Sequence, residues 1–492
     1  MWFGGGSGRA VRVAAGLAGC AVSAFAASLA HGDTLESALV QAYLNNPSLN
    51  SQRAAVRVTD ENVPQALSGY RPKITVTATG GQQSVSSTSQ QPNPLNSTAP
   101  ITCTKISCPP DYNPAYYSSQ SGYNTPVALG ATITQTIYNG YQTANKTRQA
   151  ESQVLAARAT LGLTVQTVLL NAATAYMNLL RDGAILNLQR RNVEVLQEQL
   201  RQTRDRFNVG EVTRTDVAQA ESRLAAGRSQ VLTAEANYKA SQATYRQVIG
   251  INPGKLDAGT PVDRFSPHTL PAAVSTGTAI HPSVTTAEYN VDVAMQAVKV
   301  AEGALLPTVS VQGNYTKNIG VVGSLNTDQS YQATILGSIS VPIYQGGAEY
   351  SLVRQAKETL GQRRLDLDTA RDSVRQTIVQ SWGQLDAAKS NIDSTQAQVQ
   401  AAEIALDGVR QEARVGQRTT LDVLNAQQEL VNSRVALVTA QRDRVVASYT
   451  LLAAVGRLSP QVLGLRVPVY QPVVHYQQVR DAWAGTRNPD GR

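Results

Sequence analysis

Side chains suited to catalysis or metal binding are few and scattered in this chain. None of its four histidines lies beside a cysteine or an acidic cluster; they are His31, His268, His281 and His475. The sequence also contains no glycine-rich phosphate-binding loop. We therefore expect no catalytic site, no metal site and no cofactor, which argues against an enzyme.

Two of the three cysteines, Cys103 and Cys108, lie close together in the segment ITCTKISCPPDYN. A zinc site there would need two further ligands nearby, and the segment contains no histidine. In an exported protein, cysteines at this spacing are suited to a short-loop disulfide. We expect Cys103 and Cys108 to be bridged.

A repeated polar motif is more informative. Residues 207–224 read FNVGEVTRTDVAQAESRL and residues 413–430 read ARVGQRTTLDVLNAQQEL, at an offset of 206 positions. The matched residues are Gly210 and Gly416, Thr213 and Thr419, and Asp216 and Asp422. Glycine permits positive φ where a helix ends, and threonine with aspartate three positions later forms a capping box where a helix begins. Each motif therefore predicts a tight turn between two helices.

The duplication extends well beyond these turns. At the same offset Gly250 matches Gly456, and further upstream Pro47 matches Pro282 at an offset of 235, so the first copy holds 29 additional residues. A unit of this length is too long for a solenoid repeat and indicates two similar halves of one architecture. We assign a first repeat to residues 31–250, a linker to 251–277, a second repeat to 278–456 and a C-terminal tail to 457–492.

Residues 1–30 read as a secretory signal peptide. Arg9 and Arg12 precede the uncharged run VAAGLAGCAVSAFAASLA, whose small residues suit cleavage after Ala30. One alternative is a membrane helix, for which the run is short and weakly hydrophobic, and another is a lipoprotein modified at Cys20. Without the signal peptide, 41 Lys and Arg stand against 35 Asp and Glu, and this net charge of +6 is spread along predicted helices as alternating bases and acids, which argues against nucleic-acid binding.

Two long stretches lack proline and repeat apolar residues at three- and four-residue spacing. They predict helices over residues 141–207 and 347–413, each 67 residues and about 100 Å long, that pack in coiled-coil fashion. After each turn we expect a second, shorter helix, over 213–249 and 419–455. Helices preceding Pro72 and Pro307 are expected to continue the line of these shorter helices.

Four other segments alternate apolar and polar residues, which is typical of strands. They are residues 72–80, 128–138, 307–316 and 331–344. We expect one apolar face to meet lipid, as in a transmembrane barrel, with Val309, Val311, Ile335, Ile339 and Val341 on it. Four strands cannot close a barrel, so either the edges stay open or two or three chains share one barrel.

This arrangement resembles the TolC-like family of outer-membrane efflux and secretion ducts, from TLESALVQAYLNNPSL at Thr34 to AAVGRL at Leu458. The resemblance implies an α+β membrane protein that forms a homotrimer. Its twelve-stranded β-barrel would lie in outer-membrane lipid and its helical barrel in the periplasm. The tunnel would stay closed until a periplasmic adaptor and an inner-membrane pump of the ABC or RND type dock. The adaptor would contact the hairpin tips at Val209, Gly210, Val415 and Gly416.

The resemblance also implies a gate at those tips. Arg418 would face Thr215 and Asp216 on the neighbouring hairpin and help to hold the entrance shut. Asp422 would form an acidic ring around the pore.

Two positions depart from the best-known pattern of the family. Ala413 replaces a link-forming tyrosine, and Asn425 replaces a second pore aspartate. We therefore expect a ring of three carboxylates and a weaker lock on the closed state.

The exported substrate has two interpretations. The tip sequences GEVTRTDVAQAE and TTLDVLNAQQELVNSRV slightly favour a type I secretion duct for proteins or peptides, with a multidrug efflux component as the alternative. A more distant alternative is a periplasmic coiled-coil adaptor or structural protein without a barrel, for which the alternating segments would have no use.

Overall fold

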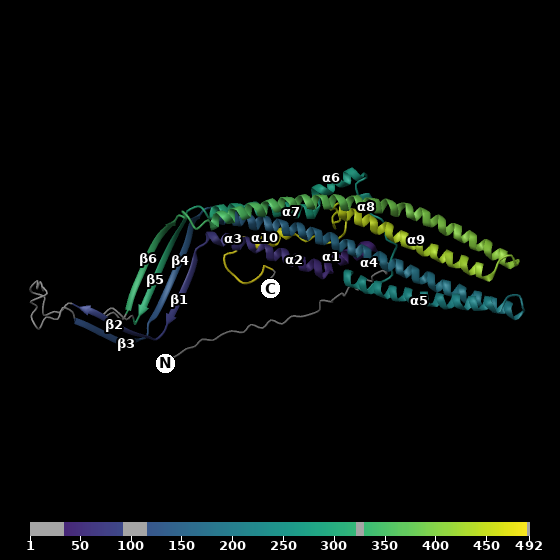
Figure 1. The fold of residues 1–492 in the computed structure, drawn as a ribbon, viewed down its shortest axis with the longest axis horizontal. Helices are drawn as coiled ribbons and strands as arrows, with labels where there is room; N and C mark the ends of the chain where they lie inside the picture. Colours follow the sequence, from purple (N-terminus) through teal and green to yellow (C-terminus); the bar gives the residue numbers. More distant parts are fainter. Residues whose placement is uncertain (1–33, 92–115, 321–328, 490–492) are drawn as a thin grey trace, which may run out of the picture.

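The structure of this chain is a computed structural model that describes residues 34–91, 116–320 and 329–489. The molecule is elongated, with a β-sheet near one end and paired helices at the other (Figure 1). The predicted signal peptide and the predicted bridge between Cys103 and Cys108 lie outside the described residues.

Two antiparallel helical hairpins form the end away from the sheet. In the first, α4 (Gln142–Asn208) returns as α5 (Arg214–Ile249), and in the second, α8 (Ala348–Arg414) returns as α9 (Thr420–Ala454). Both long helices contain 67 residues and correspond to the two predicted long helices, displaced by one residue. Continuous helix of this length requires the absence of proline from both stretches, because an internal proline would remove a backbone hydrogen bond.

Shorter helices lie beside the long ones toward the sheet. In the first copy they are α1 (Leu35–Asn45), α2 (Pro47–Asp60), α3 (Asn62–Leu67) and the 3-10 turn η1 (Ser68–Tyr70). In the second copy they are α6 (Leu270–Ile280) and α7 (Pro282–Gly303), preceded by the 3-10 turn η3 (Asp263–Phe265). Asn46 donates from Nδ2 to the carbonyl oxygen of Val248 (2.9 Å), so the end of α5 meets the corner between α1 and α2.

The main hydrophobic core lies where α1, α5 and α9 pack around the middle of α4. Tyr176 and Tyr245 are completely buried there, together with Leu452. By length and composition alone, α4 contains a stretch apolar enough to cross a membrane. Buried side chains of α4 between Leu161 and Leu179 line this core.

The sheet is antiparallel, in the order β1-β4-β5-β6. The strands are β1 (Lys73–Gly80), β4 (Val127–Asn139), β5 (Thr308–Ile319) and β6 (Gln329–Ser340). In the described part of the chain, β1 and β6 each pair along one edge only. An exposed edge carries unpaired backbone donors and acceptors and is a template for another strand.

The register of the sheet separates an apolar face from a polar one. Val309 pairs with Ile339, and on the opposite face the hydroxyl groups of Ser310 and Ser338 are hydrogen-bonded (2.8 Å). Because a slip of one residue would exchange the two faces, this pairing fixes which side chains point outward together. As predicted, Val309, Val311, Ile335 and Ile339 share one face, and Ile335 and Ile339 are 85% and 72% exposed.

One prediction at this end was wrong, and one pair of strands was not predicted. The strand predicted to reach residue 344 ends at Ser340, so Val341 lies beyond β6. The additional residues of the first copy also contain a second hairpin, β2 (Gln83–Gln91) paired with β3 (Tyr116–Asn124). These strands are rich in serine and glutamine and lack the apolar alternation on which the strand prediction depended.

Candidate functional site: the paired hairpin tips

The turn between α4 and α5 is built by a positive-φ glycine and a capping box. Gly210 has φ of 82° and donates its N–H to the carbonyl oxygen of Phe207 (3.0 Å), which ends the long helix. Thr213 then caps α5, because Asp216 accepts from the Thr213 N–H (2.9 Å) while the Thr213 hydroxyl accepts from the Asp216 N–H (3.3 Å). Both ends of the turn are therefore held by local hydrogen bonds.

The turn between α8 and α9 repeats this geometry. Gly416 has φ of 81°, and Asp422 accepts from the N–H and the hydroxyl of Thr419 (3.0 and 2.9 Å). At the apex of each turn a valine is largely exposed: Val209 is 74% exposed and Val415 is 72% exposed. The two matched apices therefore present the same exposed apolar side chain.

The capping hydrogen bonds also set the charge of the tips. The bonds from Thr213 hold the pKa of Asp216 below its usual value, and those from Thr419 do the same to the pKa of Asp422. Both carboxylates are therefore ionised at neutral pH, and each serves as a helix cap in the single chain.

This arrangement predicts that the tips are insensitive to pH near neutrality. A carboxyl group whose pKa is lowered on folding stabilises the folded form above its unfolded pKa, and this stabilisation is lost as pH falls through the folded pKa. We expect amide exchange over residues 213–217, corrected for intrinsic rates, to be unchanged between about pH 5 and 8 and to rise below about pH 4. Asp216→Asn should remove the acid-dependent rise, and a transition near pH 6 would contradict this origin.

An ion pair braces each tip, and the two pairs have opposite polarity. In the first tip Arg206 on α4 pairs with Glu211 in the turn (2.8 Å), whereas in the second Glu412 on α8 pairs with Arg418 in the turn (2.8 Å). We did not predict these braces, although positions 206 and 412 are equivalent in the duplication and carry opposite charges. This reversal of charge between the two copies is the sequence feature from which the ion pairs could have been predicted.

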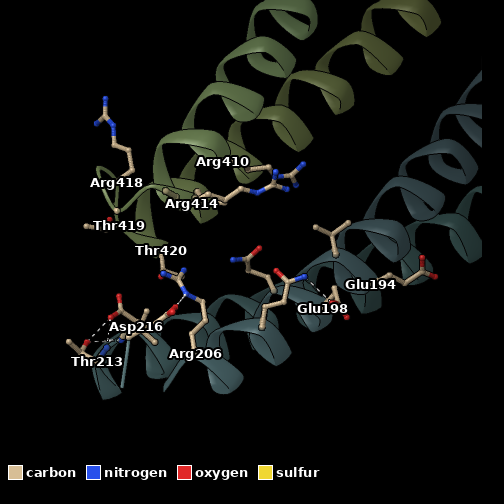
Figure 2. Close-up of a pocket in the computed structure, with 18 residues that line it drawn as sticks. Glu194, Glu198, Arg206, Thr213, Asp216, Arg410, Arg414, Arg418, Thr419 and Thr420 are labelled. Carbon is tan, nitrogen blue, oxygen red and sulfur yellow. Dashed lines mark hydrogen bonds and ion pairs between the residues drawn. The ribbon is translucent and has the colours of Figure 1, made fainter. Parts of the chain in front are cut away.

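The predicted gate residues lie near one another without forming the predicted contact in the single chain. Asp216 and Arg418 both line a groove of about 730 Å³ between the two hairpins, but Arg418 is paired with Glu412 of its own tip. Figure 2 shows Arg418 extending away from Asp216. Thr215 is exposed on the first turn of α5. Closure of an entrance by Arg418 and an acidic ring at Asp422 therefore remain predictions.

The groove between the hairpins has walls of different charge. Arg410 and Arg414 project from α8 toward the α4 wall, which carries Glu194 and Glu198 (Figure 2). The hydrogen bond from Arg201 lowers the pKa of Glu198 to about 2, so this carboxylate stays ionised. Within the described residues, no group of three or more His, Cys, Asp or Glu is placed to hold a metal ion.

A polar junction behind the groove joins the two hairpins. Gln427 on α9 accepts from Arg410 of its own hairpin (2.9 Å) and donates to Asn192 on α4 (3.4 Å), so one amide bridges three helices. Asn425, at the predicted position of a lost pore aspartate, accepts from Arg223 on α5 (2.7 Å). Neither role was predicted, since these partners are far apart in the sequence.

An apolar contact reinforces this junction. Leu424, next to Asn425, is 2% exposed and packs in a small cluster with Leu196 and Leu200 of α4 and Leu224 of α5. The start of α9 therefore packs on the first hairpin, whereas α8 forms the side of the groove that faces α4. A movement of the whole second tip away from the first must therefore disturb this cluster or bend α9.

Comparison with known proteins identifies relatives over nearly the whole chain. A family model described as outer membrane efflux protein matches residues 38–251 and 277–457. The outer membrane efflux protein BepC of Brucella suis biovar 1 (strain 1330) is 40% identical over 460 residues, which cover 94% of this chain and 93% of BepC. The outer membrane protein TolC of Escherichia coli (strain K12) is 27% identical over 474 residues, covering 93% and 89%. The crystal structure of the Campylobacter jejuni CmeC outer membrane channel matches with a TM-score of 0.71 and 18% identity, covering 91% of this chain and 89% of that one.

Proposed function

This chain belongs to the outer membrane efflux protein family, and on that premise we propose that three copies form an exit duct serving a pump in the inner membrane. Membership makes the chain an outer-membrane channel of the TolC family and not an enzyme. The observation that carries the proposal is the four-stranded sheet with one exposed apolar face. An apolar face of this kind is stable when lipid covers it.

The open edges of the sheet support assembly from several copies. In a bilayer, unpaired backbone groups are costly, so membrane-spanning sheets close into barrels. A unit with β1 at one edge and β6 at the other closes when β6 of each copy pairs with β1 of the next. Three units give twelve strands, which is wide enough for a channel, whereas two would give eight strands with a lumen filled by side chains.

The hairpin tips support docking to a periplasmic adaptor. They lie at the end of the molecule opposite the sheet (Figure 1), and each presents an exposed valine at its apex. Two matched tips per chain give six quasi-equivalent tips in a trimer, which an adaptor ring can grip at regular intervals. We assign the adaptor contact to Val209, Gly210, Val415 and Gly416.

We infer that the exported substrates are small toxic molecules, because the relative with 40% identity is named for efflux. A strain lacking this chain should become sensitive to such compounds and should regain resistance when the chain is restored. The proteins in its culture medium should be unchanged. Loss of a secreted protein with unchanged resistance would assign the duct to type I secretion, as the tip sequences suggest. No change in either measurement would contradict an export function.

We expect Asp422→Asn to lower the cation preference of the trimer in planar bilayers. Three carboxylates around a narrow entrance attract cations, and removing their charge removes that attraction. Asparagine keeps an acceptor for the Thr419 N–H, so the helix cap is preserved. Unchanged reversal potentials for Asp422→Asn would remove Asp422 from the pore.

A further inference from the structure

The chain continues past α9 as residues 457–489, a segment that we name the C-terminal strap. It runs back from the helical region beside α2 and α3 toward the sheet, and it contains α10 (Pro472–Val479) (Figure 1). Its first part packs on the main core through Leu463, Leu465 and Val467. The strap therefore connects the middle of the molecule to the base of the sheet along one side.

The strap is fastened to α1 and α2 at Tyr470. The Tyr470 N–H donates to the hydroxyl oxygen of Tyr43 (3.1 Å). The Arg53 guanidinium lies over both tyrosine rings, 4.6 Å from the centroid of Tyr43 and 5.5 Å from that of Tyr470. A guanidinium that stacks on a ring from each segment joins them by cation–π attraction.

A second fastening lies under α10. Asp60, at the end of α2, is completely buried, and its carboxylate lies 3.0 Å from Nδ1 of His475 and 3.8 Å from Arg158 of α4. The same arginine lies over the ring of Tyr476 at 5.1 Å. A buried carboxylate is tolerated only with partners, so docking of the strap completes the environment of Asp60.

The last fastening is at Arg71, which immediately precedes Pro72 and the start of β1. Arg71 donates from Nη1 to the carbonyl oxygen of Ala482 (2.6 Å), and its guanidinium lies 4.7 Å from the ring of Trp483. The strap thus ends at the junction where the helices of the first copy become the sheet.

The strand that follows this junction lies at an edge of the sheet. In the described part of the chain β1 pairs only with β4, whereas β5 pairs with both β4 and β6. The residue of the second copy that matches Arg71 is Leu306, before β5, and it lacks a guanidinium to hold a strap. The strap therefore reaches the junction of an edge strand and not that of the central one.

We propose that the C-terminal strap positions β1 for pairing with a second copy of this chain. The proposal rests on the assembly from several copies given above. The edge of β1 that pairs is then aligned from outside the sheet, by a segment that packs on the helices and contacts Arg71.

The test compares Trp483→Ala, Arg71→Lys and the double variant by hydrogen exchange of the purified protein in detergent. Trp483 is 73% exposed, so its removal leaves no buried cavity, and lysine keeps the charge of Arg71 without the planar stacking group. Each single variant should raise exchange in β1 by about two- to fivefold and leave β5 unchanged. The double variant should add little, because both changes remove one contact. Val474→Ala, an exposed change on α10, is the control and should have no effect.

Two results would overturn the proposal: unchanged exchange in β1, or an equal rise in β1 and β5, which would make the strap a general stabiliser. A second measurement is the temperature at which the trimer dissociates. This temperature should be lower in the variants than in the wild type and unchanged in the control. If the wild-type protein forms no trimer, the assembly itself fails. Exchange in β1 still reports separately whether the strap holds the strand.

Discussion

Ile335→Arg should prevent the chain from accumulating as a trimer in the outer membrane. Ile335 lies near the middle of β6 on its exposed apolar face, paired with Gly313. An arginine facing lipid near the bilayer midplane costs about 2 to 4 kcal/mol, so three copies together lose roughly 6 to 12 kcal/mol. That loss is comparable to the whole folding stability of a typical domain. The measurement is the yield of heat-resistant trimer in outer-membrane fractions.

The matched control is Thr334→Arg in the same strand. Thr334 pairs with Asn314 on the polar face, where a charged side chain can reach water in the lumen. We expect this variant to assemble nearly as well as the wild type. If both arginine variants assemble, or if only Thr334→Arg fails, the lipid-facing side of the sheet has been assigned wrongly.

Arg418→Glu should open the entrance more than Arg418→Ala does. If Arg418 braces Asp216 of a neighbouring hairpin, the substitution replaces attraction by repulsion at three symmetry-related places. One exposed ion pair is weak, but three together can shift the closed-to-open ratio by about five- to a hundredfold. Salt should weaken the same link, because exposed charges are screened. The measurement is single-channel conductance of the purified trimer without an adaptor.

The brace within the second tip provides a control for this experiment. Arg418 is held by Glu412 in the single chain, so Glu412→Gln frees the guanidinium for a partner across the groove. We expect Glu412→Gln to keep the channel closed or close it further, and Asp216→Arg combined with Arg418→Glu to recover part of the closure. If Glu412→Gln opens the channel as much as Arg418→Glu does, the brace within the tip is what holds the entrance. If Arg418→Glu conducts like the wild type, Arg418 is no part of the gate.

The sequence predicts those parts of the fold that depend on local periodicity and on the duplication. Apolar spacing without proline indicates both long helices, and the glycine and Thr-x-x-Asp pairs indicate both tips, because capping is decided within a few residues. The hairpin of β2 and β3 was missed because its side chains show no alternation, while backbone pairing leaves no trace in hydropathy.

The ion pairs and hydrogen bonds at the tips were harder to predict, because a long side chain can reach several partners. Nothing in the spacing of Arg418 distinguishes Glu412 in its own tip from Asp216 across the groove. The bond from Arg223 to Asn425 joins residues 202 positions apart, so only the packing of α5 beside α9 reveals it. Comparing charges between matched positions of the duplication was the one signal that pointed to the braces.

Because α4 and α8 are equally long, both hairpin tips lie at the same distance from the sheet. Each contains 67 residues, which sets both tips at about 100 Å from the helix starts. A single inserted residue in one helix would turn everything beyond it by about 100° and move one ring of tips by about 1.5 Å relative to the other. A longer or shorter duct for a wider or narrower periplasm therefore requires matched changes in both halves, and each change must keep the coiled-coil register. The lengths of the long helices in the two repeats are therefore coupled. The length of the duct can change during evolution only when both helices change by the same number of residues.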